Sequence, residues 1–464
     1  MKTISHPSSA PDMLETPQTT DAHNKTVAFY TLGCKTNQLE SATLAQQFEG
    51  QGWKVVPFDH SAQVYVINSC TVTQRSDNET QRVIRRAKLA NPSAQIAVTG
   101  CYAQVAPQEV AAQPGVTHVV GNDLKGQLTQ LVLANTVDLV DTVPSEPHVW
   151  VQEIDKSRMV EGATQGGIDR TRASLKIQDG CDFQCTYCII WEARGKSRSL
   201  PVADLLLSLQ RLIDEGFTEV VLTGINIGQY QCPVTNADLA TLLEQMLSVS
   251  GTFRLRLSSL DPYEVTPELV NVLQRYARFG ATQGASLCPH IHLSAQSGED
   301  VVLKRMGRRH HAADVARVCH ELIAAVPNIA IGSDIIVGFP GETPERFEAT
   351  AALLASIPIH YYHVFSYSKR KGTPAASFPE QVPEREKKER ATKLKAQSDA
   401  AWLAYRQSFV DQPLTMIVET DGRKGVTENY IHVALPKSAT AEAGSMVPIH
   451  IYRIEQTITT AVAI

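Results

Sequence analysis

The sequence lacks the features that would take a chain to or through a membrane. Its first residues are polar and rich in Pro, Ser and Thr, without the apolar segment and cleavage site of a secretory signal. No run approaches the roughly 20 apolar residues of a membrane-spanning helix. We therefore expect a cytoplasmic protein without a membrane partner, and we predict that residues 1–25 form a disordered tail.

The sequence also lacks a strong excess of one charge. Its 43 Lys and Arg stand against 48 Asp and Glu, which gives a net charge of −5. Because the chain as a whole is not basic, any contact with RNA must come from local patches. The length of 464 residues predicts about three domains of ordinary size, and the average composition indicates a globular fold.

The nine cysteines are an odd number, and in a reducing cytoplasm clustered cysteines indicate metal ligands more than disulfides. Three of them, Cys181, Cys185 and Cys188, have the spacing C-x-x-x-C-x-x-C within KIQDGCDFQCTYCIIWEARGKSRS (176–199). A fourth ligand, which normally closes a zinc site, is missing from this stretch. An iron–sulfur cube held by three cysteines keeps one iron open for a small molecule. A zinc site and an iron–sulfur cluster are therefore both possible here.

Short strands and helices alternate between residues 26 and 135. We predict strands at 27–33, 64–69, 95–100 and 117–122. A helix is predicted to begin at Ser76, where Ser76 and Glu79 form a capping-box pattern, and to end at Asn91, before a proline. This alternation predicts an α/β domain with an open parallel sheet and helices on its faces.

Three further cysteines, Cys34, Cys70 and Cys101, each follow directly after one of the first three predicted strands. The carboxyl ends of parallel strands lie on one edge of a sheet, where open α/β sheets bind ligands. A single buried cysteine usually acts as a small apolar residue. The alternative to a shared metal site is therefore that these three cysteines are buried independently of one another. Three at equivalent strand ends predict a second cluster, again with one open iron.

The second half of the chain repeats the β/α pattern. Strands are predicted at 173–178, 218–224, 253–259, 289–294, 329–339 and 360–368. Helical stretches lie between most of them, which predicts a partial or full α/β barrel. In such barrels the chemistry lies at the carboxyl ends of the strands, and the loop with Cys181 follows the first of them. Several polar and glycine residues follow later strands: Gly224, Asn226, Gln296, Asp334, Gly338 and Glu342.

The last part of the chain differs from the rest. A charged helix is predicted at 384–410, and short strands are predicted at 414–420, 429–435 and 445–454. Strands separated by turn residues predict a small all-β barrel at 411–464. Tyr430 suits either base stacking or the barrel core. Residues 136–170 lack long periodicity and are interpreted as a linker with one strand at 148–154.

The cysteine motifs resemble those of a known family. C-x-x-x-C-x-x-C with R-G-x-S-R-S downstream resembles the cluster motif of the methylthiotransferase branch of the radical S-adenosylmethionine (SAM) enzymes. TLGCKTNQLES, NSCTVT and GCYAQ resemble the three cysteine motifs of the amino-terminal domain of that family, and GVTENYIHV resembles its RNA-binding TRAM domain. The resemblance implies a methylthiotransferase amino-terminal domain at 26–135, a radical SAM core at 171–400 and a TRAM-like domain at 411–464.

The resemblance also implies the cofactors, which are two [4Fe–4S] clusters and SAM. One cluster would be held by Cys181, Cys185 and Cys188, and the other by Cys34, Cys70 and Cys101. Gly224 and Asn226 would lie near the methionine end of SAM, and Gln296 and Asp334 near its ribose or adenine. An electron donor such as flavodoxin or ferredoxin would supply the reducing electron.

The string after Cys70, CTVTQRSDNETQRVIRRAKLANP, narrows the implied substrate. It resembles that of enzymes that methylthiolate C2 of N6-threonylcarbamoyladenosine at position 37 of tRNA, so the implied partner is the tRNA anticodon stem-loop. N6-isopentenyladenosine in tRNA and an aspartate of a ribosomal protein are alternative substrates. A non-catalytic, zinc-binding RNA-binding protein is an alternative of another class.

Some positions depart from the family pattern or match none of its motifs. Trp191 stands where the family usually has proline, and Ala295 replaces a leucine. Three cysteines match no ligand motif, and we interpret them as structural: Cys232, Cys288 and Cys319. A basic group on the helix after Cys70 suits either a solvated face or a phosphate contact; it comprises Arg82, Arg85, Arg86 and Lys88.

Overall fold

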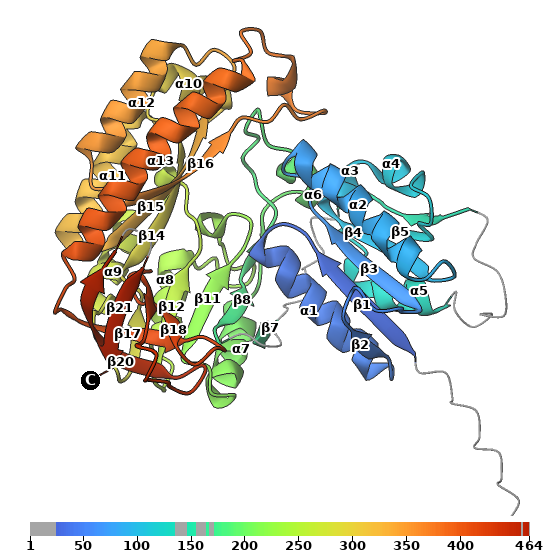
Figure 1. Ribbon diagram of the computed structural model, residues 1–464, viewed down its shortest axis with the longest axis horizontal. Coiled ribbons are helices and arrows are strands. Elements are labelled where there is room, and N and C mark those ends of the chain that lie inside the picture. Colours follow the sequence, from blue (N-terminus) through green and yellow to red (C-terminus); the bar gives the residue numbers. More distant parts are fainter. Residues whose placement is uncertain (1–24, 135–145, 155–163, 167–170, 456–457, 464) are drawn as a thin grey trace, which may run out of the picture.

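The computed structural model describes residues 25–134, 146–154, 164–166, 171–455 and 458–463. Two α/β units lie side by side, and a small β-barrel packs below the second of them (Figure 1). The predicted tail at 1–25 lies almost wholly outside the described residues. Among the described helices, none is long and apolar enough to cross a membrane.

The first unit is a six-stranded parallel sheet with the order β2-β1-β3-β4-β5-β6. Its strands are β1 (Thr26–Thr31), β2 (Lys54–Val56), β3 (Val64–Ser69), β4 (Gln95–Gly100), β5 (His118–Val120) and β6 (His148–Trp150). Its helices are α1 (Lys35–Gly50), α2 (Gln74–Ala90), α3 (Cys101–Val105), α4 (Pro107–Ala111) and α5 (Leu128–Ala134), with a 3₁₀ turn at Lys125–Gln127. All residues of β3 and β4 are buried, because helices cover both faces of the sheet.

The four strands predicted for this unit are confirmed, and the strand predicted within 148–154 is β6, which extends the same sheet. The predicted helix start at Ser76 is wrong. The helix α2 begins at Gln74, and the Thr73 side chain accepts a hydrogen bond from the Ser76 backbone N–H. Thr73, and not Ser76, is therefore the N-cap residue. Glu79 forms an ion pair with Arg82 at 2.5 Å instead of closing a capping box. Its end before Asn91 is confirmed.

The second unit is a partial barrel of parallel strands. They are β8 (Ala173–Lys176), β11 (Glu219–Thr223), β12 (Phe253–Leu257), β14 (His290–Gln296), β15 (Ala330–Val337) and β16 (Tyr361–Ser366). All six were predicted. They form two sheets, β13-β12-β11-β8-β7 and β14-β15-β16, where β7 is Thr164–Gly166 and β13 is Ala285–Leu287. A single parallel bridge between Leu260 and Leu293 joins the two sheets.

Helices cover the outside of this partial barrel (Figure 1). They are α7 (Val202–Asp214), α8 (Leu239–Leu247), α9 (Pro267–Tyr276), α10 (Asp300–Met306), α11 (Ala312–Ala325) and α12 (Pro344–Ser356). Shorter elements follow strand ends: β9 (Gln178–Asp179), α6 (Ile190–Arg194), β10 (Arg198–Ser199), and 3₁₀ turns at Ile227–Gln229, Pro262–Glu264 and Pro374–Ser377. One large apolar core lies between the strands and the helices.

The predicted charged helix is α13 (Glu384–Gln407), which packs against β16 and leads to the last unit. That unit is a closed barrel with the order β17-β18-β19-β21-β20. Its strands are β17 (Pro413–Val418), β18 (Lys424–Thr427), β19 (His432–Ala434), β20 (Met446–Ile454) and β21 (Thr459–Ala463). The small all-β barrel was predicted, but the short strands β18 and β21 were not. The domain boundaries at 135, 170 and 400 stay a prediction.

Candidate active site

The first cysteine triplet lies at one edge of the parallel sheet. Cys34 precedes the first residue of α1, Cys70 follows β3 and Cys101 is the first residue of α3, directly after β4. The strands β1, β3 and β4 are adjacent and parallel, so their carboxyl ends lie together. Burial raises the pKa of Cys70, and the nearby thiols of Cys101 and Cys34 raise it further. The fold therefore brings the three cysteines together at one sheet edge.

Two glycines let the backbone come close to this triplet. Gly33 has φ +94°, and a Cβ there would lie 2.8 Å from Sγ of Cys70. Gly100 has φ +95°, and a Cβ there would lie 2.3 Å from the carbonyl oxygen of Ser69. Any other residue at these positions would meet both an unfavourable backbone conformation and a clash.

The second triplet lies on the loop that follows the first strands of the partial barrel. Donors point at each of its sulfurs: the Phe183 N–H at Cys181 Sγ, the Ile190 N–H at Cys188 Sγ and Arg308 Nη1 at Cys185 Sγ, each at 3.4 Å. Hydrogen bonds to sulfur are a feature of iron–sulfur sites, because they stabilise the ligating thiolates. Burial raises the pKa of two of these thiols, to about 11 for Cys181 and about 12 for Cys188.

The spacing of the sulfurs tests the zinc alternative. In the described part of the chain, one set of three His, Cys, Asp or Glu ligand atoms lies within 4.8 Å of one another, and it is His292, Asp334 and His363. At least one pair of sulfurs in each triplet therefore lies more than 4.8 Å apart. Ligands of tetrahedral zinc at 2.3 Å lie only about 3.8 Å apart. Both triplets thus fit a cluster of several metal atoms better than one zinc ion.

A cavity of about 320 Å³ lies between the three units. Its lining includes Cys34 from the first unit, Gly224, Arg256, Asp334 and His363 from the partial barrel, and Tyr430 from the last barrel. Two of the four predicted SAM-binding residues, Gly224 and Asp334, therefore line one cavity together with a cysteine of the first triplet. The cavity adjoins the carboxyl ends of the barrel strands, where α/β barrels carry their chemistry.

The other two predicted SAM-binding residues lie elsewhere. Asn226 donates from Nδ2 to Glu264 Oε1 at 2.9 Å. Burial raises the pKa of the Cys181 thiol, and the Asn226 side chain beside it offsets a small part of that rise. Burial and the neighbouring Asp261 raise the pKa of Glu264 to about 8. Gln296 ends β14 with φ +66°, a conformation that is rare outside glycine. Asn226 thus lies after β11, beside Cys181, and neither Asn226 nor Gln296 lines the cavity.

Asp334 is held between two imidazoles. Its Oδ1 lies 2.9 Å from His292 Nε2 and 3.3 Å from His363 Nδ1. These separations are compatible with hydrogen bonds. Burial alone would raise the pKa of Asp334, but the two histidine contacts outweigh burial and hold the pKa well below its usual range. Asp334 is therefore a carboxylate that faces the cavity.

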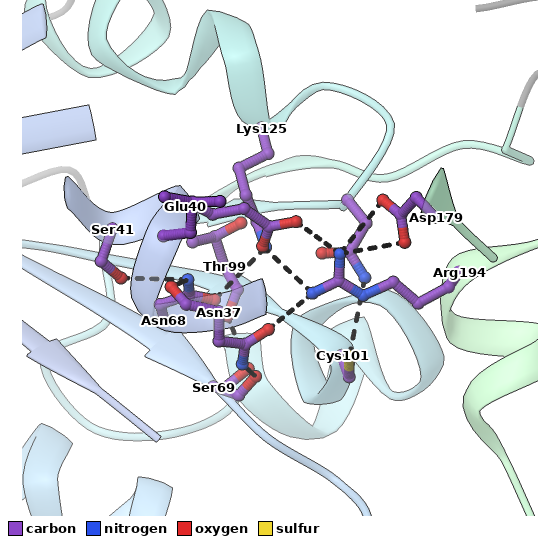
Figure 2. Close-up of polar contacts among 12 residues, drawn as sticks. Asn37, Glu40, Ser41, Asn68, Ser69, Thr99, Cys101, Lys125, Asp179 and Arg194 are labelled. Carbon is purple, nitrogen blue, oxygen red and sulfur yellow. Dashed lines mark hydrogen bonds and ion pairs between the residues drawn. The ribbon is translucent and has the colours of Figure 1, made fainter. Parts of the chain in front are cut away.

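A buried polar cluster joins the two cysteine-bearing units (Figure 2). Arg194, on the helix after Cys188, donates from Nη2 to Glu40 Oε2 at 3.0 Å and to Asn37 Oδ1 at 2.5 Å. Its Nη1 lies 3.2 Å from Asp179 Oδ2. Figure 2 shows the guanidinium of Arg194 between the two carboxylates. Since Glu40 lies on α1, directly after Cys34, this arginine fixes one cysteine segment against the other.

Two lysines complete this cluster. Lys125 Nζ lies 2.6 Å from Glu40 Oε2, and Lys176 Nζ lies 3.0 Å from Glu40 Oε1. With Arg194, and with Arg198 at 3.9 Å from Asp179 Oδ2, they make four cations against the carboxylates of Glu40 and Asp179. Burial lowers the pKa of Lys125, and the nearby Cys101 thiol is one of the groups that counter this shift.

Four polar residues of this site were not predicted from the sequence: Glu40, Arg194, Arg308 and Glu264. Glu40 and Arg194 both occur within the quoted cysteine motifs. A polar residue inside such a motif was the one sequence signal that could have indicated a role at the site. The basic group on α2 is partly engaged, because Arg82 pairs with Glu79 and Arg86 pairs with Asp59 at 2.5 Å. Cys319 and Cys288 are buried, as expected for structural cysteines.

Two family models match the chain. Residues 26–121 match the uncharacterized protein family UPF0004, and residues 175–354 match the radical SAM superfamily. A structure of the radical SAM methyltransferase TsrM from Kitasatospora setae, with cobalamin and a [4Fe–4S] cluster bound, superposes with a TM-score of 0.53. It is 15% identical and covers 76% of this chain and 77% of that chain, so the likeness concerns the fold. The fold and the triplet on its first loop define a radical SAM protein.

Two proteins of similar sequence identify the family within this superfamily. The chain is 39% identical over 440 residues to the threonylcarbamoyladenosine tRNA methylthiotransferase MtaB of Bacillus subtilis (strain 168), with 92% of this chain and 94% of that protein covered. It is 38% identical over 408 residues to the protein of the same name from Thermotoga maritima, with 88% and 89% covered. The chain belongs to the radical SAM methylthiotransferases of the MtaB type. It is a transferase, and its cofactors are SAM and two [4Fe–4S] clusters.

Proposed function

We propose that this chain methylthiolates C2 of N6-threonylcarbamoyladenosine at position 37 of tRNA. One observation carries the proposal: Cys34 of the first triplet lines the same cavity as Gly224 and Asp334 of the radical SAM unit. A sulfur source at the first triplet and a SAM molecule at the second would then reach one substrate base. The relatives named above are tRNA methylthiotransferases by name, which supports this substrate.

The two triplets would hold the two clusters. The residues are Cys34, Cys70 and Cys101 for one cluster, and Cys181, Cys185 and Cys188 for the other. When bound, the clusters and SAM supply the radical chemistry, the sulfur and the methyl group that an unactivated aromatic C–H requires. The chain's own residues hold the sulfurs: the backbone N–H groups of Phe183 and Ile190 donate to Cys181 and Cys188.

We propose that SAM lies along the strand ends of the partial barrel. Gly224 lines the cavity there, and the absence of a Cβ lets its backbone pack against Gln178, whose carbonyl oxygen would lie 2.8 Å from such an atom. Asn226, beside Cys181, suits the methionine end of SAM. Asp334 presents a carboxylate to the cavity, and carboxylates accept hydrogen bonds from ribose hydroxyls. Gln296, at the end of β14, would lie near the ribose or adenine.

The remaining partners follow from this reaction. A tRNA substrate places the protein in the cytoplasm, and the anticodon stem-loop suits it because loop bases can be splayed out into a pocket. An electron donor such as flavodoxin or ferredoxin would reduce the cluster at Cys181. Isopentenyladenosine in tRNA and a ribosomal-protein aspartate are not favoured, because the relatives named above are threonylcarbamoyladenosine enzymes by name.

A nucleoside mass profile of total tRNA tests the proposal. Cells without the gene should lose methylthiolated threonylcarbamoyladenosine and accumulate the form without the methylthio group. Complementation with the wild-type chain should restore the product, whereas Cys34→Ala and Cys181→Ala should each fail to do so. Cys319→Ala, at a buried cysteine outside both triplets, is the matched control and should complement. An unchanged profile in the deletion strain would refute the proposed substrate.

A further inference from the structure

One residue of the carboxyl-terminal barrel reaches the cavity of the radical SAM unit. Tyr430, in the turn between β18 and β19, lines this cavity together with Cys34, Gly224 and Asp334. The barrel therefore contributes directly to the cavity where the reaction is proposed to occur. That position differs from a role in which the barrel only anchors RNA at a distance.

The turn that carries Tyr430 is docked firmly on the partial barrel. Arg256 on β12 donates to the backbone carbonyls of Thr427 and Glu428 at 2.9 and 3.0 Å. Arg254, two residues earlier on the same strand, donates to the carbonyl of Val426 at 2.9 Å. Both arginines are almost fully buried. These contacts fix the height of Tyr430 above the ends of the barrel strands.

The same arginines are held from the other side by one carboxylate. Glu219 on β11 accepts from Arg254 Nε at 2.6 Å and from Arg256 Nε at 2.7 Å. Burial alone would raise the pKa of Glu219, but the two guanidinium groups outweigh burial and hold it well below its usual range. The arginines therefore keep a fixed direction towards the turn, and charged partners make their hydrogen bonds strong.

The backbone of Tyr430 is itself unusual. Its φ is +68°, and residues other than glycine occupy this region at some cost in free energy. The turn is closed by hydrogen bonds from the Tyr430 N–H to the Thr427 carbonyl at 3.0 Å and from the Ile431 N–H to Thr427 Oγ1 at 2.9 Å. A bulky residue held in this conformation at a cavity wall indicates a function for the side chain.

The ring of Tyr430 belongs to an aromatic group on that wall. Its centroid lies 4.6 Å from the ring of His290 and 5.9 Å from the ring of Tyr361, with both pairs stacked. The guanidinium carbon of Arg256 lies 5.5 Å from the ring centroid. The ring is therefore supported, while within the described part of the chain no residue forms a hydrogen bond with its hydroxyl.

We propose that Tyr430 is a specificity-determining residue whose hydroxyl donates a hydrogen bond to the carboxylate of the threonylcarbamoyl group on the substrate adenine. This inference rests on the proposed function. A phenol hydroxyl donates a strong hydrogen bond to an anionic oxygen. Because neighbouring side chains pack against the ring of Tyr430, its hydroxyl is held in one place. Lys35 lines the same cavity, and its positive charge favours an anionic group on the substrate, whereas the charge of Arg256 is already paired with Glu219.

The test compares two substrates and three chains. The purified full-length chains, with clusters reconstituted, are wild type, Tyr430→Phe and Tyr452→Phe. Tyr452 is a half-exposed tyrosine of β20 in the same barrel, so it is the matched control. The substrates are a tRNA with threonylcarbamoyladenosine at position 37 and the same tRNA with its threonyl carboxylate converted to the methyl ester.

Tyr430→Phe should lower kcat/KM on the acid substrate about tenfold or more, the size expected for a hydrogen bond to a charged group. On the ester it should match wild type, because the charged acceptor is gone. Iron content should not change, and Tyr452→Phe should behave as wild type on both substrates. An unchanged kcat/KM on the acid, or an equal loss on both substrates, would overturn the inference.

The two proposals fail in different ways. A wild-type chain that modifies neither tRNA would refute the proposed function itself. A wild-type chain that modifies the acid substrate, together with a Tyr430→Phe chain of equal kcat/KM, would refute only the role of Tyr430.

Discussion

Arg194 and Glu40 pair across the interface between the two cysteine-bearing units, with Nη2 and Oε2 3.0 Å apart (Figure 2). Each lies on the helix that follows a cysteine of its own triplet, Glu40 after Cys34 and Arg194 after Cys188. The pair therefore sets the position of one triplet relative to the other. The reaction proposed here needs that relationship, because sulfur and SAM must reach the same substrate carbon.

Glu40→Gln should destabilise the protein strongly. The change leaves Arg194, Lys125 and Lys176 buried with one carboxylate fewer, and breaking a buried ion pair on one side costs about 3–5 kcal/mol. Urea unfolding measures this loss. The matched control is Glu321→Gln, which removes an exposed partner of Arg317 and should change the free energy of unfolding by about 0.5 kcal/mol or less. Equal effects of the two substitutions would contradict this account of the interface.

Gly33→Ala should remove the cluster of the first unit while keeping the other. Its Cβ would lie 2.8 Å from Sγ of Cys70, so the cysteine must move. Iron bound per chain, measured after reconstitution, should fall by about half. Gly52→Ala is the control, because Gly52 also has a positive φ of +78° but has no atom within 4 Å of the added Cβ. If Gly33→Ala bound as much iron as Gly52→Ala, the contact with Cys70 would not matter for the cluster.

Trp191→Pro should make the cluster at Cys181, Cys185 and Cys188 harder to reduce. Burial raises the pKa of Cys188, the backbone N–H groups of Ile190 and Trp191 oppose that rise, and proline has no N–H to contribute. Proline is tolerated in the first turn of a helix, and Trp191 is the second residue of α6. The loss of one hydrogen bond of about 1 kcal/mol corresponds to a shift of about 50 mV to more negative potential.

Redox titration of Trp191→Pro with the wild-type chain measures this shift. Trp191→Ala removes the indole but keeps the N–H, so it should titrate close to wild type. A Trp191→Ala chain that shifted as far as Trp191→Pro would assign the effect to the side chain instead.

His118 should make the first unit less stable in mild acid. Its side chain is fully buried on β5, and burial, followed by the neighbouring His148, lowers its pKa to about 4. Between the ordinary histidine pKa of about 6.5 and the folded pKa, the unfolded chain binds the proton and the folded chain does not. Stability therefore falls as the pH falls through this window, by up to about 3 kcal/mol.

His118→Phe should remove this part of the pH dependence in urea unfolding between pH 6.5 and pH 4. Phenylalanine keeps an aromatic ring beside those of His148 and Trp150, which stack on each other at 5.3 Å. His320→Gln, at an exposed position of α11, is the control and should keep the wild-type profile. A His118→Phe chain with the wild-type profile would exclude His118 as its origin.

The strands were predictable from the sequence because their signals are local. The apolar runs of β3 and β4 lie between turn residues, and each is followed at once by a cysteine. Since parallel strands share an edge, the convergence of Cys70 and Cys101 followed from topology alone. Local patterns were less reliable at the start of α2, where Thr73, three residues before Ser76, provides the capping oxygen.

The partners of the buried polar cluster were not predictable in this way. Glu40 and Arg194 are separated by 154 residues, and on α1 the glutamate reads as an ordinary helix-surface residue. Its burial depends on how two domains meet, which no periodicity encodes. Tyr430 is similar: its motif suited both base stacking and a barrel core, and only the docking of Arg256 on its turn places it at the cavity.

The most direct measurement is the product formed by the purified, reconstituted chain with SAM, a chemical reductant, a sulfur source and a tRNA that carries threonylcarbamoyladenosine at position 37. Nucleoside mass analysis should show the methylthio group on that adenosine for the wild-type chain and none for Cys34→Ala or Cys181→Ala. A wild-type chain that cleaves SAM but leaves the adenosine unmodified, or a Cys34→Ala chain that still forms the product, would contradict the account that both triplets serve one cavity.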